Sequence, residues 1–248
     1  LGLVGSEMCI RDSDKFPSTK LAGMLVQGWD AIISVLKKQM DARKVLAVDL
    51  YTGVYEEEVL DAFSKEFSGK VMNVRDLMKP EQEIQTLTER FMTEDVLFGY
   101  VTNLKLEDYF DADKLAAAQK QISEAEDTIV IIGTGAAMVA PQDAMIVYAD
   151  MARWEIQQRF RRHEVKALGI DNRKDAVSLQ YKRGYFNDWR VCDRYKERLF
   201  DRVEFWIDTH VAGTPKMIDK DTFFKGVEAT VNTCLLYTSD AADDRISV

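Results

Sequence analysis

The sequence contains few of the residues that build disulfide frameworks and metal centres. Its 248 residues include three cysteines and two histidines. Cys9, Cys192 and Cys234 are an odd number without metal-site spacing, and His163 and His210 lie far apart with no second ligand motif beside either. We therefore expect neither a disulfide framework nor a zinc site in this chain.

Long apolar runs and an excess of positive charge are also missing. No stretch approaches the roughly 18 consecutive apolar residues of a spanning helix, and the first residues lack the basic and apolar regions of a secretory signal. The net charge is −9 and the pI is near 4.9, so the long-range field repels nucleic acid and anionic membranes. We expect a cytoplasmic globular protein with neither as a partner.

The two ends of the chain differ from its middle. Residues 1–13 (LGLVGSEMCIRDS) and 234–248 (CLLYTSDAADDRISV) show no sustained amphipathic period and resemble translated sequencing-adapter sequence. The alternative is a pair of ordinary disordered termini. We expect artefactual tails at 1–13 and 234–248, one domain over residues 14–233, and a missing continuation beyond Thr233.

Hydrophobic spacing in the middle predicts strands that alternate with helices. Short apolar, β-branched runs predict strands at 44–50, 70–74, 128–132, 144–149 and 203–207. Apolar residues at steps of three and four predict helices at 21–38, 54–67, 81–92, 112–124, 151–168, 176–199 and 220–231. Such alternation favours right-handed crossovers. We expect a three-layer αβα fold with a mainly parallel sheet, in which strands 44–50, 128–132 and 144–149 are neighbours or near neighbours.

A strand, a glycine and a helix follow one another in residues 48–58 (VDLYTGVYEEE), as in folds that hold phosphates with free backbone N–H groups. A working P-loop also needs the triplet Gly-Lys-Ser/Thr, which this sequence lacks. Residues 56–58 are glutamates that put negative charge where phosphates would lie, although they also suit the first turn of a helix. Gly53 is a candidate anion-binding residue, but we expect no productive ATP binding.

A second glycine turn follows the strand at 128–132. Gly133, Thr134 and Gly135 resemble the start of a dinucleotide fingerprint, but its third glycine would fall on Met138. The turn could hold a small anion with its amides, or it could simply need glycine for a tight bend. Both interpretations stay open.

The remaining candidates are charged. Residues 153–202 contain fourteen Lys or Arg and eight Asp or Glu, a local balance of +6 in a chain of −9. Arg159 and Arg162 in this stretch are candidates for a sugar phosphate or an acidic surface, unless their stems cover apolar surface on solvated helices. Asp49 and Asp150 end two expected strands, where α/β sites gather, and are the best candidates for binding a metal.

Three segments resemble the N-terminal region of long bacterial class I mannose-6-phosphate isomerases. They are residues 14–37 (DKFPSTKLAGMLVQGWDAIISVLK), 131–172 (including VYADMARWEIQQRFRRHEVKALGIDN) and 180–208 (QYKRGYFNDWRVCDRYKERLFDRVEFWID). The resemblance implies a non-catalytic front domain, whose partner is a missing C-terminal cupin-like domain that binds zinc and interconverts mannose 6-phosphate and fructose 6-phosphate. The zinc motif of that domain, of the type LQVHP, matches nothing here. We therefore expect no cofactor and no catalytic residue in this fragment.

The layout of the front domain is similar to uridine kinase-like P-loop proteins. The loop lysine and hydroxyl are absent, which implies a degenerate kinase-like domain. Two alternatives stay open, namely a nucleotide-dependent small-molecule kinase and an interaction or oligomerisation module that forms a homo-oligomer.

Overall fold

The computed structural model describes residues 20–67 and 70–243, with side chains as far as residue 232. It divides into two compact units, one of residues 25–217 and one that joins residues up to 24 with residues from 218 onward. The first unit contains the sheet, and the second contains most of helix α10 (Lys220–Asp243). Within the described residues, no helix combines the length and the hydropathy that crossing a bilayer requires.

A seven-stranded sheet with the order β1-β7-β6-β5-β2-β4-β3 forms the centre of the first unit. Strand β2 (Val45–Leu50) pairs in parallel with β4 (Ile129–Gly133) on one side and with β5 (Met145–Asp150) on the other. Strands β3 (Lys70–Asn73) and β6 (Val203–Asp208) extend this parallel part. The short β1 (Val26–Gln27) pairs antiparallel with β7 (Lys216–Asp219).

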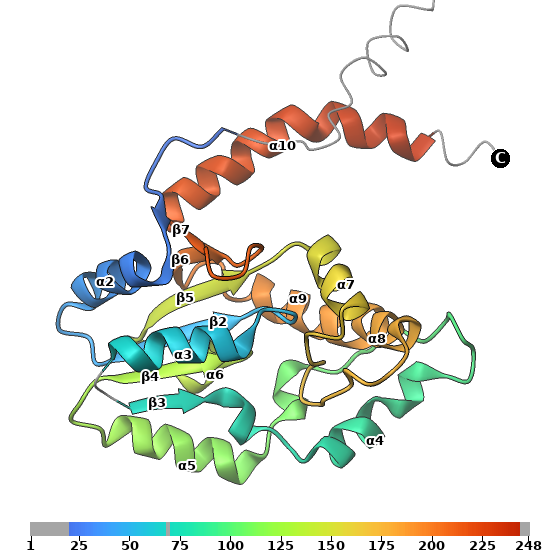
Figure 1. Cartoon of the computed structure of the whole chain (residues 1–248), viewed down its shortest axis with the longest axis horizontal. Helices are drawn as coiled ribbons and strands as arrows, with labels where there is room; N and C mark the ends of the chain where they lie inside the picture. The colour runs from blue at the N-terminus through green and yellow to red at the C-terminus, as the bar shows by residue number, and fades with distance from the viewer. Residues whose placement is uncertain (1–19, 68–69, 244–248) are drawn as a thin grey trace, which may run out of the picture. The chain divides into compact units, whose positions relative to one another are not determined.

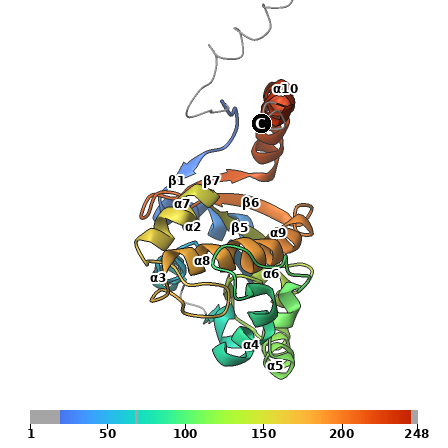
Figure 2. The same ribbon diagram turned by 90° about the vertical axis from the view of Figure 1, so that its right-hand side faces the viewer.

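Helices cover both faces of the sheet, which explains why its central strands are continuous apolar runs. Every residue of β2 and β4 is buried. Helices α2 (Trp29–Met40) and α3 (Glu56–Glu66) pack together on one face, and α6 (Ala136–Val139) and α9 (Trp189–Glu197) lie on the other (Figures 1 and 2). This confirms the three-layer αβα fold, the mainly parallel sheet and the adjacency of the three central strands.

The remaining helices surround the carboxyl ends of the strands. They are η1 (Val74–Leu77), α4 (Glu81–Met92), η2 (Leu106–Tyr109), α7 (Arg153–Arg161), α8 (Val177–Arg183) and the π-helical segment η3 (Gly184–Asp188). Helix α5 (Ala112–Ser123) contacts α6 and leads back to the amino end of β4. All five strands expected from the sequence are present to within one residue at each end. The sequence pattern missed the short β1 and β7.

Four expected helices differ from those observed, and one of them, the helix expected at 220–231, continues to Asp243 in α10. The expected helix 21–38 begins only at Trp29, because Gly28 adopts a φ of 85° and Val26 and Gln27 pair with β7. The expected helix 151–168 ends at Arg161, where His163 takes a φ of 56°. The expected helix 176–199 is continuous in direction but contains the π-helical segment η3.

The expected tails lie mostly outside the described residues. Residues 1–13 and 244–248 belong to the undescribed part, and the backbone of α10 stays helical as far as Asp243. Their packing and their origin remain predictions.

Candidate functional site at the carboxyl edge of the sheet

The carboxyl ends of β2, β3 and β4 meet at a topological switch point. The chain leaves β2 toward β3 on one side, returns through β4, and then crosses to β5 on the other side of β2. In open α/β sheets, ligands bind in the crevice that such a reversal creates beyond the strand ends. The strand order therefore locates the candidate site before any side chain is considered.

A pocket lies at this edge, and we call it the carboxyl-edge pocket. Its cavity volume is about 40 Å³, measured as the space open to the centre of a water-sized sphere, and the pocket is partly open to solvent. Its walls are the loop after β2 with the start of α3, the η1 segment after β3, the turn after β4, and the segment after α7. The lining residues are 50–57, Arg75, Met78, Thr134 and 164–168.

Each of the two cationic side chains in the pocket is paired with a glutamate from the first turn of α3. Arg75 Nε donates to Glu56 Oε2 at 2.9 Å, and Lys166 Nζ donates to Glu57 Oε1 at 2.7 Å. The hydrogen bond from Lys166 lowers the pKa of Glu57. The expected conflict between these glutamates and an anion is therefore reduced, because their charge is balanced inside the protein.

One oxygen in the pocket wall has no partner. Glu56 Oε1 is buried and accepts no hydrogen bond from any described residue, while Oε2 is held by Arg75. A buried acceptor without a donor costs about 1–3 kcal/mol. Such an oxygen indicates a place where a donor from outside the protein would be favourable.

The shape of the loop requires a glycine at position 53. Its φ is 91°, and a Cβ there would lie 2.8 Å from Cγ1 of the buried Ile156 on α7. The glycine thus allows α7 to pack directly on the loop. The carbonyl oxygen of Gly53 accepts a hydrogen bond from Arg159.

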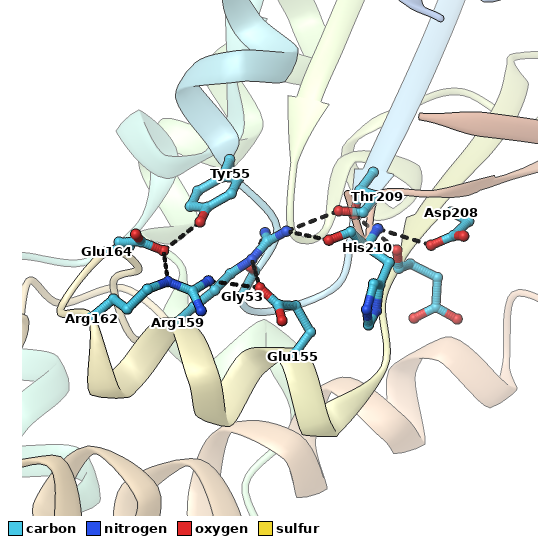
Figure 3. Close-up of polar contacts among 10 residues, drawn as sticks. Gly53, Tyr55, Glu155, Arg159, Arg162, Glu164, Asp208, Thr209 and His210 are labelled. Atoms are coloured by element: carbon cyan, nitrogen blue, oxygen red, sulfur yellow. Dashed lines mark hydrogen bonds and ion pairs between the residues drawn. The ribbon is translucent and has the colours of Figure 1, made fainter. Parts of the chain in front are cut away.

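Arg159 is fully buried and clamps the loop to the end of β6 (Figure 3). Its Nη1 donates to Gly53 O at 2.9 Å, and its Nη2 donates to Thr209 O at 2.9 Å and to His210 O at 3.3 Å. The guanidinium lies 3.7 Å from the centroid of the Tyr55 ring. Carbonyl groups of the protein thus accept from the donors of Arg159 that were expected to meet a phosphate, and phosphate binding by Arg159 stays a prediction.

Arg162 is exposed and belongs to a chain of polar contacts beside the pocket (Figure 3). It donates to Glu155 Oε1 at 2.7 Å and to Glu164 Oε2 at 2.8 Å, and Glu164 also accepts from the hydroxyl of Tyr55. Burial and this hydrogen bond raise the pKa of Tyr55. Arg162 therefore ties α7 to the segment 164–168 and does not line the pocket.

Asp49 occupies the amides that the second glycine turn would offer to an anion. Its carboxylate accepts from Gly135 N at 3.1 Å, from Ala137 N at 2.9 Å and from the hydroxyl of Tyr195 at 2.7 Å. Burial raises the pKa of Asp49 to about 6, although all three bonds act to lower it. The Asp49 carboxylate thus accepts from amides of the turn that were expected to hold a small anion. Anion binding by Gly133 to Gly135 and metal binding by Asp49 stay predictions.

Asp150 is also committed to protein contacts. Its carboxylate accepts from Met151 N at 2.9 Å and from the ammonium of Lys196, which lies 5.4 Å from the ring centroids of Tyr51 and Tyr148. Among the residues that the structure describes, no group of three His, Cys, Asp or Glu could hold a metal ion. A metal site on Asp49 and Asp150 stays a prediction.

The sequence interpretation missed Arg75 and Lys166 as parts of the site. Arg75 follows β3 at the carboxyl edge, so the rule that located Asp49 and Asp150 could also have found it. Lys166 lies in a turn that the pattern predicted as helix, and no signal in the sequence marks it. Thr134 lines the pocket as expected of the glycine turn, whereas Gly133 and Gly135 do not.

Comparisons with known proteins add a family and a general likeness. A family model described as Domain of unknown function (DUF8485) matches residues 28–232. No curated protein matches the chain. A gluconokinase from Sinorhizobium meliloti 1021 is similar in structure, with a TM-score of 0.37 and 12% identity over 79% of this chain and 96% of that one. A shikimate kinase from Bacteroides thetaiotaomicron gives a TM-score of 0.30 and 13% identity over 62% of this chain and 97% of that one. Likenesses at TM-scores this low carry no argument about the site.

Proposed function

Since this chain belongs to the family described as Domain of unknown function (DUF8485), we propose from its own geometry that it is a kinase-like binding domain. In this proposal the carboxyl-edge pocket binds a small, hydroxyl-bearing molecule and the domain does not transfer a phosphoryl group to it. The observation that carries the proposal is the pocket itself, which lies at the switch point of a parallel sheet.

The balance of charge in the pocket supports a hydroxyl-bearing ligand. Arg75 and Lys166 are each paired with a glutamate, so a polyanion would have to break these pairs or lie beside the carboxylates. A hydroxyl group can donate and accept at once. It could therefore satisfy Glu56 Oε1 as a donor while accepting from the cationic side of the pocket.

The loop after β2 argues against phosphoryl transfer. Transfer from a nucleotide depends on cationic and metal-binding groups around the terminal phosphates, including the P-loop lysine and the hydroxyl that holds magnesium. Here the segment from Tyr51 to Glu56 (YTGVYE) contains no lysine. Its central carbonyl, that of Gly53, is held by Arg159.

The proposal is tested by calorimetric titration of the chain with glucose, gluconate, myo-inositol, inorganic phosphate and ATP with magnesium. We expect one of the three hydroxylated compounds to bind in the titration. In thermal unfolding of the chain, we expect ATP with magnesium to give no rise in melting temperature. At a hundredfold excess over its dissociation constant, a bound ligand would stabilise the chain by about 2.7 kcal/mol, so ATP binding would be visible.

Variants locate the binding. Lys166→Met removes a charge from the pocket wall, and we expect it to weaken binding several-fold. Lys174→Met is the matched control, because Lys174 is exposed nearby and does not line the pocket. Equal affinities of the two variants, or clear stabilisation by ATP, would contradict the proposal.

The resemblance of residues 14–37, 131–172 and 180–208 to long isomerases supports a second proposal. We propose that the chain is the non-catalytic front part of a longer isomerase-like protein, with zinc and the chemistry in a domain beyond Thr233. Sequencing the gene past Thr233 tests it, and a stop codon soon after that position would contradict it. We expect the present chain alone, even with added zinc, to leave mannose 6-phosphate unchanged in an isomerase assay.

A further inference from the structure

Residues 93–102, in the loop that joins α4 to η2, expose a run of large apolar side chains. In Figure 1 it projects beyond helix α8. The exposed fractions are 69% for Val96, 66% for Leu97, 68% for Phe98, 68% for Tyr100 and 56% for Val101. Scattered surface hydrophobes are ordinary, but a contiguous patch of this kind marks an interaction site.

The start of the loop is fixed by Lys182. This ammonium belongs to a side chain that is only 3% exposed, and it donates to Thr93 O at 3.2 Å and to the carbonyl of Asp95. The Asp95 carboxylate in turn accepts from Leu97 N and Phe98 N, both at 2.7 Å. These two bonds lower the pKa of Asp95.

Backbone hydrogen bonds fix the end of the loop. Tyr100 N donates to Phe91 O at 2.8 Å, and Thr102 N donates to Phe186 O at 2.9 Å. Gly99 lies so close to Phe91 O that a Cβ would clash with this oxygen, and the same Cβ would lie 3.1 Å from the Phe186 ring. The loop is thus built to hold apolar groups in solvent, and binding through it would require little further ordering.

We propose that this loop is a homodimer interface in which the loop of one copy packs against the same loop of a second copy. With the exposed fractions above, the five residues expose about 600 Å² per copy, so a contact that covered all of this surface on both copies would bury about 1,200 Å², the lower end of specific interfaces. Residues 96–104 contain no charged side chain. Two copies can therefore meet there without repulsion despite a net charge of −9, as a twofold contact of identical patches requires.

Sedimentation velocity on the full 248-residue chain, at concentrations from about 1 to about 100 µM, measures the association. We expect a concentration-dependent dimer, and we expect Phe98→Asp to weaken it at least about tenfold. Because Phe98 is mostly exposed, this variant should keep the thermal stability of the wild type. Val227→Asp is the control, since Val227 is a 44% exposed apolar residue on α10, outside the loop.

Three results would overturn the interface. They are a wild-type chain that stays monomeric over the whole range, a dimer that survives Phe98→Asp in folded protein, and a dimer that Val227→Asp disrupts while Phe98→Asp does not. If Phe98→Asp fails to fold, Tyr100→Asp replaces it as the variant, with the same expected loss of association.

Discussion

Asp49 is a carboxyl group whose proton affinity changes on folding. Burial raises its pKa from 3.8 to about 6, so between these values the folded chain binds a proton more tightly than the unfolded chain. The contribution of Asp49 to the free energy of unfolding is fully present below about pH 4, and it is lost as the pH rises to about 6. A shift of this size corresponds to about 3 kcal/mol.

Asp49→Asn removes this titration. We expect the free energy of unfolding of the wild type, relative to that of the variant, to fall as the pH rises from 4 to 6 and to stay level above that. Urea unfolding of both proteins at a series of pH values measures the difference. Parallel pH profiles would show that Asp49 does not titrate in this range.

Arg159 stabilises the fold through hydrogen bonds from its buried guanidinium to backbone carbonyls. Replacing it with Met leaves the carbonyls of Gly53 and Thr209 without a donor in the interior, and each such loss costs about 1–3 kcal/mol. We expect Arg159→Met to destabilise the chain by about 2–5 kcal/mol in urea unfolding. Arg161→Met, on the exposed side of the same helix, should change stability little. A similar effect of both substitutions would contradict the clamp.

Residues of this kind are only partly predictable from sequence. Asp49 could be identified as important because it ends a strand, but its partners Gly135 and Ala137 are 86 and 88 positions away. The sequence therefore could not distinguish a metal ligand from an internal anion. Arg159 was expected to face a ligand because it lies in the basic stretch 153–202. Nothing in the neighbouring sequence shows that Gly53 and Thr209 surround its side chain.

At the scale of elements, the packing of α7 on the loop after β2 depends on Gly53. In Gly53→Ala the new Cβ meets Ile156 and the residue keeps a φ of 91°. Gly28→Ala is a matched control, because Gly28 has a φ of 85° with open space around it. We expect the control to lose about 1–3 kcal/mol from backbone strain and Gly53→Ala to lose clearly more. Thermal unfolding compares the two, and equal losses would show that the contact with Ile156 is unimportant.

The elements themselves were largely predictable. The central strands are buried on both faces, so their apolar runs carry a strong signal, and the expected helix 81–92 has the same bounds as α4. The expected helix 21–38 began too early because Leu21 and Leu25 match the helical period but are 48% and 64% exposed. Periodicity alone could not reveal that Gly28 and the pairing with β7 interrupt it.

At the scale of the whole molecule, the strand order brings distant segments to one edge of the sheet. Residues 50–57, Arg75, Thr134 and 164–168 share the carboxyl-edge pocket although more than a hundred positions separate the first from the last. The alternating pattern of strands and helices predicted the parallel sheet. A parallel sheet in turn predicts a ligand site at the carboxyl edge of its strands. The pattern did not predict which side chains meet there, because Arg75 lies in the short η1 segment and Lys166 lies in the irregular segment after α7.

The most direct test of the binding pocket is an NMR titration of the ¹⁵N-labelled chain with the hydroxylated compound that binds in calorimetry. The pocket hypothesis predicts that the largest shifts fall on the backbone amides of residues 51–57, Thr134 and 164–168, while ATP with magnesium leaves the same amides unchanged. Shifts centred elsewhere in the chain, or a response of these amides to ATP alone, would contradict it.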